Sequence, residues 1–480
     1  MICLVNPYIT SRERYGRNIG DIGGHQMPLG IYYLAAFLLR EGEEVNVFDC
    51  EALKMSSEQL LKILKDSKVK VVGFTSTTVS FYRVCSWAEM IRRELPDIKT
   101  VIGGPHMSAM PEETMMTGVF DYGIVHEGEI AFLKLVKFLL HGEGELKYIP
   151  NLYYLDRGKV LHNPSDAYIQ DLDTLPFPAR QLCLDLSIYK PPIGAFRKKL
   201  AMNLFTSRGC PNKCIFCDNN TFGRRTRFFS AEYVVREIKE LVHRFGAKEI
   251  VFLDDTFVLD KRRLHKIFEL LERENIRFPW TCMTRVDNLD NETLKLMADN
   301  GCWQIRFGVE SGNQDVINFI RKGITLEQVR DVTNWGKKLG MKMTGFFMIG
   351  HHIDTPKTIQ ETIEFALSLP LTDIVATLNT PMPGTESYEK ARFYGEYHKE
   401  NLSFFNYWIP VFIPKGLTPE FMLKKQSELY RRFYSQPRVI LQHFNNIRSP
   451  TAVRMYIYNI LLGARFVLKK KSLNNTSVVN

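Results

Sequence analysis

The chain has 480 residues, 45% of them hydrophobic, which is enough for two or three domains with cores of their own. Its nine cysteines are scattered and odd in number, which argues against the disulfide framework of a small secreted protein. No apolar stretch reaches the length of a membrane span and no signal peptide precedes the first predicted strand, so we expect a cytoplasmic protein.

The net charge of +10 is concentrated near one end of the chain. Residues 420–480 hold eleven Lys or Arg and two Glu, so nearly all of the excess positive charge lies there. We expect residues 391–480 to form a helical, basic C-terminal region whose surface is separate from the rest.

Residues 1–143 alternate short apolar strands with amphipathic helices. The pattern predicts strands at 2–6, 44–49, 69–75, 100–103 and 122–126, and helices at 29–41, 57–66, 81–94 and 129–141. This alternation predicts a doubly wound, Rossmann-like parallel sheet. Ligands of such sheets bind beyond the carboxyl ends of the strands.

Those strand ends carry small, hydroxyl-bearing and glycine residues. Glycines and short side chains allow a large flat cofactor to approach the backbone. For the Gly103-Gly104-Pro105 segment taken alone, a tight turn is the better explanation. The candidate positions are Thr75, Ser76, Gly103, Gly104, His106 and Glu127.

Three cysteines lie close together in the middle of the chain. Cys210, Cys214 and Cys217 have the spacing C-x3-C-x2-C, and no fourth cysteine follows nearby. Three thiolates can ligate three irons of one 4Fe–4S cluster and leave the fourth iron open to a ligand. A zinc site would need a second Cys or His pair, which the sequence lacks, and a chance grouping is the remaining alternative.

Residues 201–390 repeat strands and helices with a longer spacing, after a proline-rich connector at 144–200. Strands are predicted at 201–206, 249–253, 280–285, 303–309, 342–349 and 373–378, and helices at 231–245, 261–274, 291–300, 326–339 and 355–369. Six βα units predict a partial barrel that is open on one side. Barrel enzymes place their chemistry at the carboxyl ends of the strands, and the polar residues there are Asp254, Asp255, Arg285, Glu310, Ser311, His351 and His352.

The cysteine segment, with Phe216 before its last cysteine, resembles the signature of the radical S-adenosylmethionine (radical SAM) superfamily. The segments 28–36, 103–106 and 127–129 resemble the cobalamin-binding domain that precedes many radical SAM cores. The Asp-x-His-x-x-Gly motif that supplies the lower cobalt ligand in other cobalamin proteins does not occur. Cys3, Cys50 and Cys85 superficially suggest the tRNA methylthiotransferase branch, but their flanking residues do not match it.

The resemblance implies roles for individual residues. It places the cluster on the three cysteines, the Asp254-Asp255 pair at the amino group of SAM, and cobalamin at the strand ends of the first domain. The positions that it assigns to SAM are Phe216, Asp254, Asp255, Arg285, Glu310 and Ser311. Structural alternatives stay open: Glu310 could pair with Arg306 or Arg321, and the two aspartates could cap the next helix.

The resemblance also implies a reaction. One electron from the reduced cluster cleaves SAM, and the 5′-deoxyadenosyl radical abstracts hydrogen from an unactivated carbon. A substrate radical can then take a methyl group from methylcobalamin, which a second SAM regenerates. We therefore expect a cobalamin-dependent C-methyltransferase of a lipid or other secondary metabolite. The alternatives are a radical SAM oxidoreductase, such as an oxidative cyclase or carbon–carbon coupling enzyme, and an iron–sulfur or cobalamin sensor.

Two kinds of partner are expected besides a small-molecule or lipid substrate. The resemblance implies an external electron donor such as flavodoxin or ferredoxin. Residues 429–438 and 451–471 mix aromatic and aliphatic residues with Arg and Lys in a helical pattern. Such helices either contact a membrane surface or dock their apolar side on the barrel. No motif indicates nucleic-acid binding.

Overall fold

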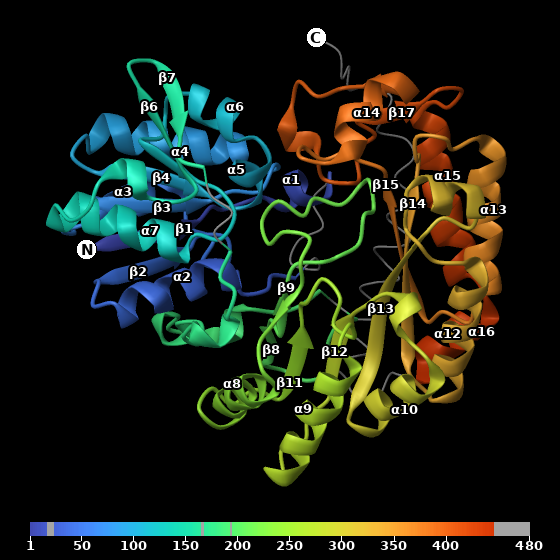
Figure 1. The fold of residues 1–480 in the computed structure, drawn as a ribbon. Helices are drawn as coiled ribbons and strands as arrows, with labels where there is room; N and C mark the ends of the chain where they lie inside the picture. Colours follow the sequence, from blue (N-terminus) through green and yellow to red (C-terminus); the bar gives the residue numbers. More distant parts are fainter. Residues whose placement is uncertain (17–23, 165–167, 193, 446–480) are drawn as a thin grey trace.

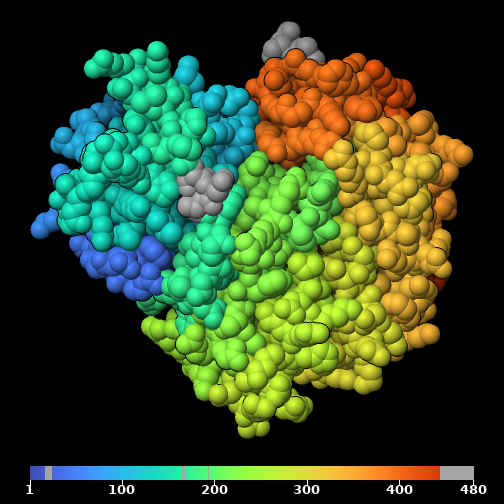
Figure 2. Space-filling view, viewed as in Figure 1, coloured from blue at the N-terminus to red at the C-terminus, as the bar shows by residue number. Residues whose placement is uncertain are grey.

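The computed structural model describes residues 1–16, 24–164, 168–192 and 194–445. It contains an N-terminal sheet and a half-open barrel that lie beside each other, with the chain from β7 to β8 passing between them (Figure 1). Figure 2 shows that the two parts meet along a continuous surface.

The N-terminal sheet has seven strands, two more than expected. Its order is β2 (Val45–Asp49), β1 (Ile2–Asn6), β3 (Val71–Thr75), β4 (Lys99–Gly103), β5 (Tyr122–Ile124), β6 (Leu152–Asp156) and β7 (Lys159–His162). The first five are parallel, as predicted. β6 and β7 are antiparallel and come from the segment that we expected to be a connector. Arg157 and Gly158 join them with φ of 47° and 78°, the backbone of a tight hairpin turn.

Helices cover both faces of this sheet, because successive side chains of each strand point to opposite sides. Ile2 and Leu4 pack with α2 (Leu29–Arg40) and α7 (Glu129–Val136). Cys3 and Val5 pack on the other face with α3 (Ser57–Lys65) and α4 (Phe81–Glu94). Cys3 and Cys50 are fully buried in this second layer, so they act as small apolar side chains. Shorter helices at the strand ends are α1 (Ser11–Tyr15), α5 (Pro105–Ala109) and α6 (Pro111–Met116).

The barrel is a parallel sheet of six strands. Its order is β15 (Asp373–Leu378), β14 (Lys342–Ile349), β13 (Cys302–Glu310), β12 (Trp280–Met283), β11 (Glu249–Phe252) and β8 (Ala201–Leu204). β8 and β15 are the two edges, so the barrel does not close. This confirms the predicted partial barrel.

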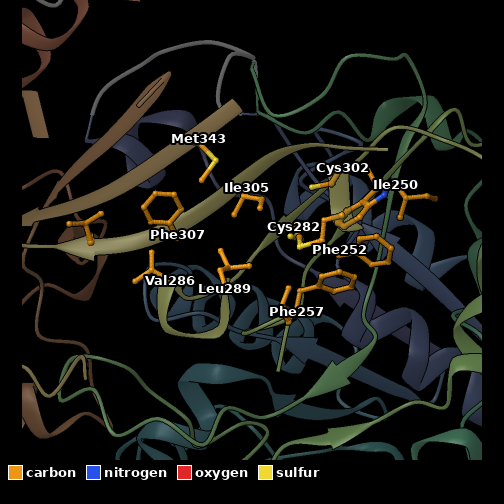
Figure 3. Close-up of a cluster of buried hydrophobic side chains, with 14 of the residues drawn as sticks. Ile250, Phe252, Phe257, Cys282, Val286, Leu289, Cys302, Ile305, Phe307 and Met343 are labelled. Atoms are coloured by element: carbon orange, nitrogen blue, oxygen red, sulfur yellow. The ribbon is translucent and has the colours of Figure 1, made fainter. Parts of the chain in front are cut away.

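Amphipathic helices pack on the outer face of these strands. They are α8 (Ala231–His243), α9 (Lys261–Arg273), α10 (Asn291–Asp299), α11 (Gln314–Phe319), α12 (Leu326–Lys338) and α13 (Pro356–Ser368). Figure 3 shows part of the resulting core, in which Phe252, Cys282, Ile305 and Phe307 point from the strands into one apolar cluster. The N-cap of α9 is Asp260, so Asp254 and Asp255 do not cap the next helix.

The C-terminal region closes one edge of the barrel. It contains α14 (Glu386–Tyr394), the hairpin of β16 (Gly395–Tyr397) and β17 (Phe412–Pro414), α15 (Pro419–Tyr434) and α16 (Pro437–Asn445). On α15, Met422, Leu429 and Phe433 are fully buried in the barrel core. Gln426 and Tyr430 hydrogen-bond to the backbone of Ala376 on the edge strand β15.

The part of the basic tail that the structure describes therefore docks its apolar side on the barrel. The second basic segment, 451–471, lies outside the described residues. Within the described part of the chain, none of the helices has both the length and the hydropathy of a membrane span.

Candidate functional site

A cavity of about 1310 Å³ lies between the carboxyl ends of the two sheets. Thr75, Gly103 and Gly104 line it from the N-terminal sheet, and Cys217 and Glu310 line it from the barrel. Parallel strands direct their carboxyl ends to one edge, and here the two edges face each other. Residues predicted for two different cofactors thus share one cavity.

The three cysteines lie on one loop above β8. The short antiparallel pair of β9 (Ser207–Arg208) and β10 (Arg227–Phe228) closes the base of this loop. Cys210 and Cys214 are buried, whereas Cys217 is exposed toward the cavity. Asn212 Nδ2 donates to Cys210 Sγ at 3.2 Å. Burial raises the pKa of Cys214, and the nearby cations Lys322 and Arg285 oppose this by favouring the thiolate.

The donor set fits a cluster better than a single metal ion. Across the described residues, no three His, Cys, Asp or Glu side chains converge on a point where one ion could be held. In a cubane cluster each thiolate ligates a different iron, so the sulfurs do not need to converge on one point. The loop therefore fits a 4Fe–4S cluster and argues against zinc.

The adjacent carboxylates of Asp254 and Asp255 have different environments. Asp254 is fully buried, and its Oδ1 accepts hydrogen bonds from Thr206 N, Thr206 Oγ1 and Ser207 Oγ. Asp255 lines the cavity, and burial together with the charge of Asp254 raises its pKa to about 6. Asp255 thus faces the cavity, while Asp254 holds the strand end before the cysteine loop.

Glu310 lies at the end of β13 with a left-handed backbone, φ 67°. Its Oε1 accepts a hydrogen bond from Lys322 Nζ at 2.7 Å, in a pair that is almost fully buried. Its ion-pair partner is thus Lys322, and not Arg306 or Arg321 as considered from the sequence; Arg321 pairs with Glu386. Glu310 still lines the cavity, and the pair with Lys322 fixes its orientation there.

Two other predicted SAM residues are engaged with protein groups. Ser311 is buried, and its Oγ hydrogen-bonds to Thr362 Oγ1 at 3.0 Å. Arg285 pairs with Asp287 at 2.8 Å, and its Nη1 points at Cys214 Sγ at 3.7 Å. Arg285 is thus a neighbour of the cluster loop, and Ser311 supports the turn after β13.

The two histidines after β14, which the sequence left undecided, are both buried. His352 Nε2 contacts the carbonyl oxygen of Ser387 at 3.1 Å, and its ring packs on Phe412. His351 packs near Phe216, and its buried Nε2 has no hydrogen-bond partner among the described residues. His352 therefore stabilises the packing of the C-terminal region, whereas His351 lies next to the cysteine loop.

The residues predicted for cobalamin divide into two groups. Thr75, Gly103 and Gly104 line the cavity, and Gly104 has φ 92°. A Cβ at Gly104 would lie 2.6 Å from Thr75 Oγ1, so this close approach requires glycine. Ser76 and His106 are buried behind them, and burial lowers the pKa of His106 to about 4. A backbone edge without bulky side chains fits a flat macrocycle.

Glu127 forms part of an ion cluster between the two sheets, which we call the inter-domain ion cluster (Glu127, Glu129, Arg208 and Arg227). Arg208 Nη1 donates to Glu127 Oε1 at 3.0 Å, and Arg208 Nη2 donates to Glu129 Oε1 at 2.8 Å. Arg227 Nη1 donates to Glu127 Oε2 at 2.8 Å. All four side chains are buried. Since Arg208 and Arg227 form the base of the cysteine loop, this cluster joins that loop to the N-terminal sheet.

Sequence reasoning missed Arg208, Arg227, Lys322 and Tyr407. Tyr407 lines the cavity from the C-terminal region, with a left-handed backbone of φ 66°. Arg208 stands two residues before Cys210, and this closeness to the cysteine motif was the one feature of the sequence that could have identified it. Nothing near Lys322 or Tyr407 in the sequence points to the cavity.

Comparison with known families gives two matches in this chain. The family model of the Radical SAM superfamily matches residues 204–366, and that of the B12 binding domain matches residues 18–136. The first contains the cysteine loop and strands β11 to β14. The second contains the strand ends that line the cavity opposite.

Individual proteins are similar over most of the chain. An uncharacterized methyltransferase of Pyrococcus horikoshii is 34% identical, over 92% of this chain and 94% of that protein. An anaerobic magnesium-protoporphyrin IX monomethyl ester cyclase of Rubrivivax gelatinosus is 25% identical, over 86% of this chain and 75% of that protein. The structure of the radical S-adenosylmethionine methyltransferase TsrM of Kitasatospora setae, with cobalamin and a 4Fe–4S cluster bound, superposes with a TM-score of 0.68 at 17% identity. The match covers 91% of this chain and 89% of that one.

Proposed function

The chain belongs to the radical SAM superfamily, and we propose from this premise that it transfers a methyl group to an unactivated carbon with cobalamin as the methyl carrier. It is an enzyme that uses a 4Fe–4S cluster, SAM and cobalamin. The similarity to the Pyrococcus methyltransferase over nearly the whole of both chains supports methyl transfer.

The observation that carries this proposal is the shared cavity. Cys217 and Asp255 on one side and Thr75 and Gly104 on the other line the same space. Bound together, the cluster and SAM supply a 5′-deoxyadenosyl radical, and cobalamin supplies the methyl group. A substrate held between the two walls is within reach of both groups without a large movement of the protein.

The residues of this chain would hold and orient these groups. Cys210, Cys214 and Cys217 would bind the cluster, and Asp255 would accept a hydrogen bond from the amino group of SAM. Glu310, held by Lys322, would face the SAM ribose. The walls exclude water from the radical.

The proposal can be tested without knowing the substrate. The full chain, reconstituted with iron and sulfide and loaded with hydroxocobalamin, is given SAM that carries a CD₃ methyl group and a low-potential reductant. We expect protein-bound cobalamin to acquire the CD₃ group while S-adenosylhomocysteine accumulates. A Cys214→Ala variant should lose SAM cleavage to 5′-deoxyadenosine. If SAM is cleaved to 5′-deoxyadenosine and cobalamin never gains the label, the methyl-transfer proposal is wrong.

A second candidate is an oxidative cyclase, because a cyclase is similar to this chain over 86% of its length. An oxidative reaction would release 5′-deoxyadenosine without S-adenosylhomocysteine. The same experiment therefore separates the two functions.

Two partners complete the proposal. The cluster needs one electron at a time, so we propose a flavodoxin or ferredoxin as donor in the cytoplasm. We also propose that the basic residues beyond position 445 bring the enzyme to an anionic membrane surface. The full chain should sediment with vesicles of phosphatidylglycerol, and a chain ending at Asn445 should not. Equal sedimentation of both would contradict the membrane proposal.

A further inference from the structure

The cavity has a wall on which the sequence predicted no cofactor-binding residue. The N-terminal sheet provides one wall, with Thr75 and Gly104, and the cysteine loop with Asp255 and Glu310 provides the second. The third wall, which we call the β14–β15 wall, combines the inner faces of β14 and β15 with chain from the C-terminal region. Its members include Phe346, Met348, Val375, Thr377, Phe405 and Tyr407.

Strand alternation points these side chains inward. Val375 and Thr377 are half-buried, whereas Ile374, Ala376 and Leu378 between and beside them are buried against the outer helices. On β14, Phe346 is half-buried and Met348 is buried, and both line the cavity, whereas Ile349 belongs to the core and Phe347 contributes to both. At the amino ends of the two strands this face carries the ion pair of Lys342 and Asp373, which does not line the cavity. At the carboxyl ends, the side chains of this face that line the cavity are apolar or hydroxyl-bearing, so the wall is apolar there.

Tyr407 covers the end of this wall. Its backbone is held in the left-handed region by a hydrogen bond from Leu378 N to its carbonyl oxygen at 2.8 Å. Its side chain is 38% exposed and lines the cavity. Backbone strain of this kind in a bulky residue persists where the surroundings enforce it, often at ligand sites. Tyr407 therefore presents a ring and a hydroxyl to whatever lies on the β14–β15 wall.

The charges around the cavity argue against an anionic occupant. Among the described residues that line it, the cations are Arg14, His25 and Arg208. Each is paired with a carboxylate of the protein: Glu51, Asp49, and Glu127 with Glu129, respectively. Asp218 and Asp255 add negative charge on the cluster side. A phosphate or carboxylate would thus lose its hydration shell with no free cation to replace it.

We propose that the substrate of this enzyme is an uncharged, largely apolar molecule that lies on the β14–β15 wall beneath Tyr407. This inference rests on the proposed function, because it assigns the remaining wall of that same site to the substrate. Burial of apolar surface on Phe346, Met348 and Val375 drives binding, and the hydroxyls of Thr377 and Tyr407 tolerate one uncharged polar group.

The neutral apolar dye Nile red serves as the probe, with the full chain reconstituted with its cluster and loaded with cobalamin. We expect Val375→Lys to weaken dye binding by at least tenfold, because a lysine on this wall buries an unpaired charge in the dye site. Leu184→Lys is the matched control, since Leu184 is fully exposed on the surface and should leave the affinity unchanged. Millimolar pyrophosphate or cytidine monophosphate should not displace the dye. Displacement by either anion, or equal dye affinity in Val375→Lys and wild type, would overturn the proposal.

A second variant keeps the test valid if Val375→Lys does not fold. Thr377→Val preserves the shape of the side chain and removes its hydroxyl, so we expect two- to fivefold tighter dye binding. Weaker dye binding by Thr377→Val would count against an apolar site.

The labelled-SAM experiment distinguishes failure of the substrate proposal from failure of the proposed function. If cobalamin in the wild-type protein does not gain the label, the proposed function is wrong. If cobalamin gains the label but the dye measurements contradict the expected affinities, only the proposed substrate class is wrong.

Discussion

At the scale of single residues, the pair Asp254 and Asp255 illustrates how neighbours in the sequence acquire different tasks. Asp254 has one oxygen occupied by three donors from Thr206 and Ser207, so it fixes the backbone that leads into the cysteine loop. Asp255 faces the cavity with no such partners. One carboxylate thus organises the protein, and the other is free to contact a ligand.

Substitution of each aspartate should separate these tasks. We expect Asp255→Asn to weaken SAM binding by roughly tenfold, because one charge-assisted hydrogen bond contributes about 1.4 kcal/mol. Its iron content should match wild type. Asp254→Ala should instead lower iron retention and the melting temperature, since Thr206 and Ser207 lose the oxygen that accepts their three hydrogen bonds. Equilibrium dialysis with SAM and iron analysis measure both, and a normal iron content in Asp254→Ala would contradict the assignment.

His25 lies on the cavity wall between two carboxylates, Asp49 and Glu51. Burial alone would lower its pKa, but the hydrogen bonds to these two residues raise it to about 9. A folded-state pKa above the unfolded value of about 6.5 means that the stabilisation is complete below pH 6.5 and is lost as the pH rises through 9.

The His25→Gln variant tests this dependence. We expect it to lose on the order of 2 kcal/mol of unfolding free energy at pH 6.5, because the buried carboxylate of Asp49 loses its cation, whereas Glu51 keeps Arg14. The difference from wild type should shrink as the pH approaches about 10. Denaturant unfolding at several pH values measures it, with the exposed His265→Gln as the control that should follow wild type throughout. A difference that stays constant with pH would contradict the charged state of His25.

At the scale of elements, the inter-domain ion cluster joins the loop before α7 to the base of the cysteine loop. His126, next to Glu127, also contacts the carbonyl oxygen of Asn220 at the far end of that loop. The loop that would carry the cluster is therefore held at both ends by the sheet that would carry cobalamin. This arrangement would set the separation between the two cofactors.

Breaking the ion cluster should change that separation. We expect Glu127→Gln to lower the melting temperature strongly, because removal of one member of a buried pair costs about 3–5 kcal/mol. Glu94→Gln, which removes an exposed pair with Lys65, should leave the melting temperature close to that of wild type. A change in the melting temperature does not show whether the distance between the two cofactors has changed. Pulsed electron paramagnetic resonance between the reduced cluster and cob(II)alamin should show one narrow distance in wild type and a broader distribution in Glu127→Gln. An unchanged distance distribution in Glu127→Gln would show that the inter-domain ion cluster contributes only to stability.

At this scale the sequence predicted most regular elements but few of their partners. β1, β14, β15 and α4 have the residues that we predicted, because their apolar periodicity is unbroken. β6 and β7 were missed because both are short, most of their side chains are at least partly exposed, and the turn between them gives a weak signal; β7 is the edge of the sheet. The partner of Glu127 is Arg208, 81 residues away, and such pairs are set by the fold and not by local pattern. The cysteines were recognisable because their ligand spacing is local.

At the scale of the whole molecule, α15 fastens the C-terminal region to the open edge of the barrel. Tyr430 donates to Ala376 O and accepts from Ala376 N, so the free backbone of β15 is satisfied by a helix. An uncovered strand edge is prone to pair with other chains.

Loss of this contact should therefore cause aggregation. We expect Leu429→Asp to produce mostly insoluble protein, because it places a charge in the core that covers β15. Arg431→Asp, a change of charge on the solvent side of the same helix, should leave solubility near wild type. Light scattering and gel filtration of both variants measure the effect. A soluble, monodisperse Leu429→Asp protein would show that α15 is dispensable.

The position of the β14–β15 wall along the chain has a consequence for how such enzymes diversify. Val375, Thr377, Phe405 and Tyr407 follow residue 366, where the match to the Radical SAM superfamily ends, whereas Phe346 and Met348 precede it. On the proposed assignment, the part of the substrate wall that comes from β15 and the C-terminal region is thus encoded after the groups that generate the radical. Recombination near that boundary would exchange this part of the wall as a unit and leave the cysteine loop intact.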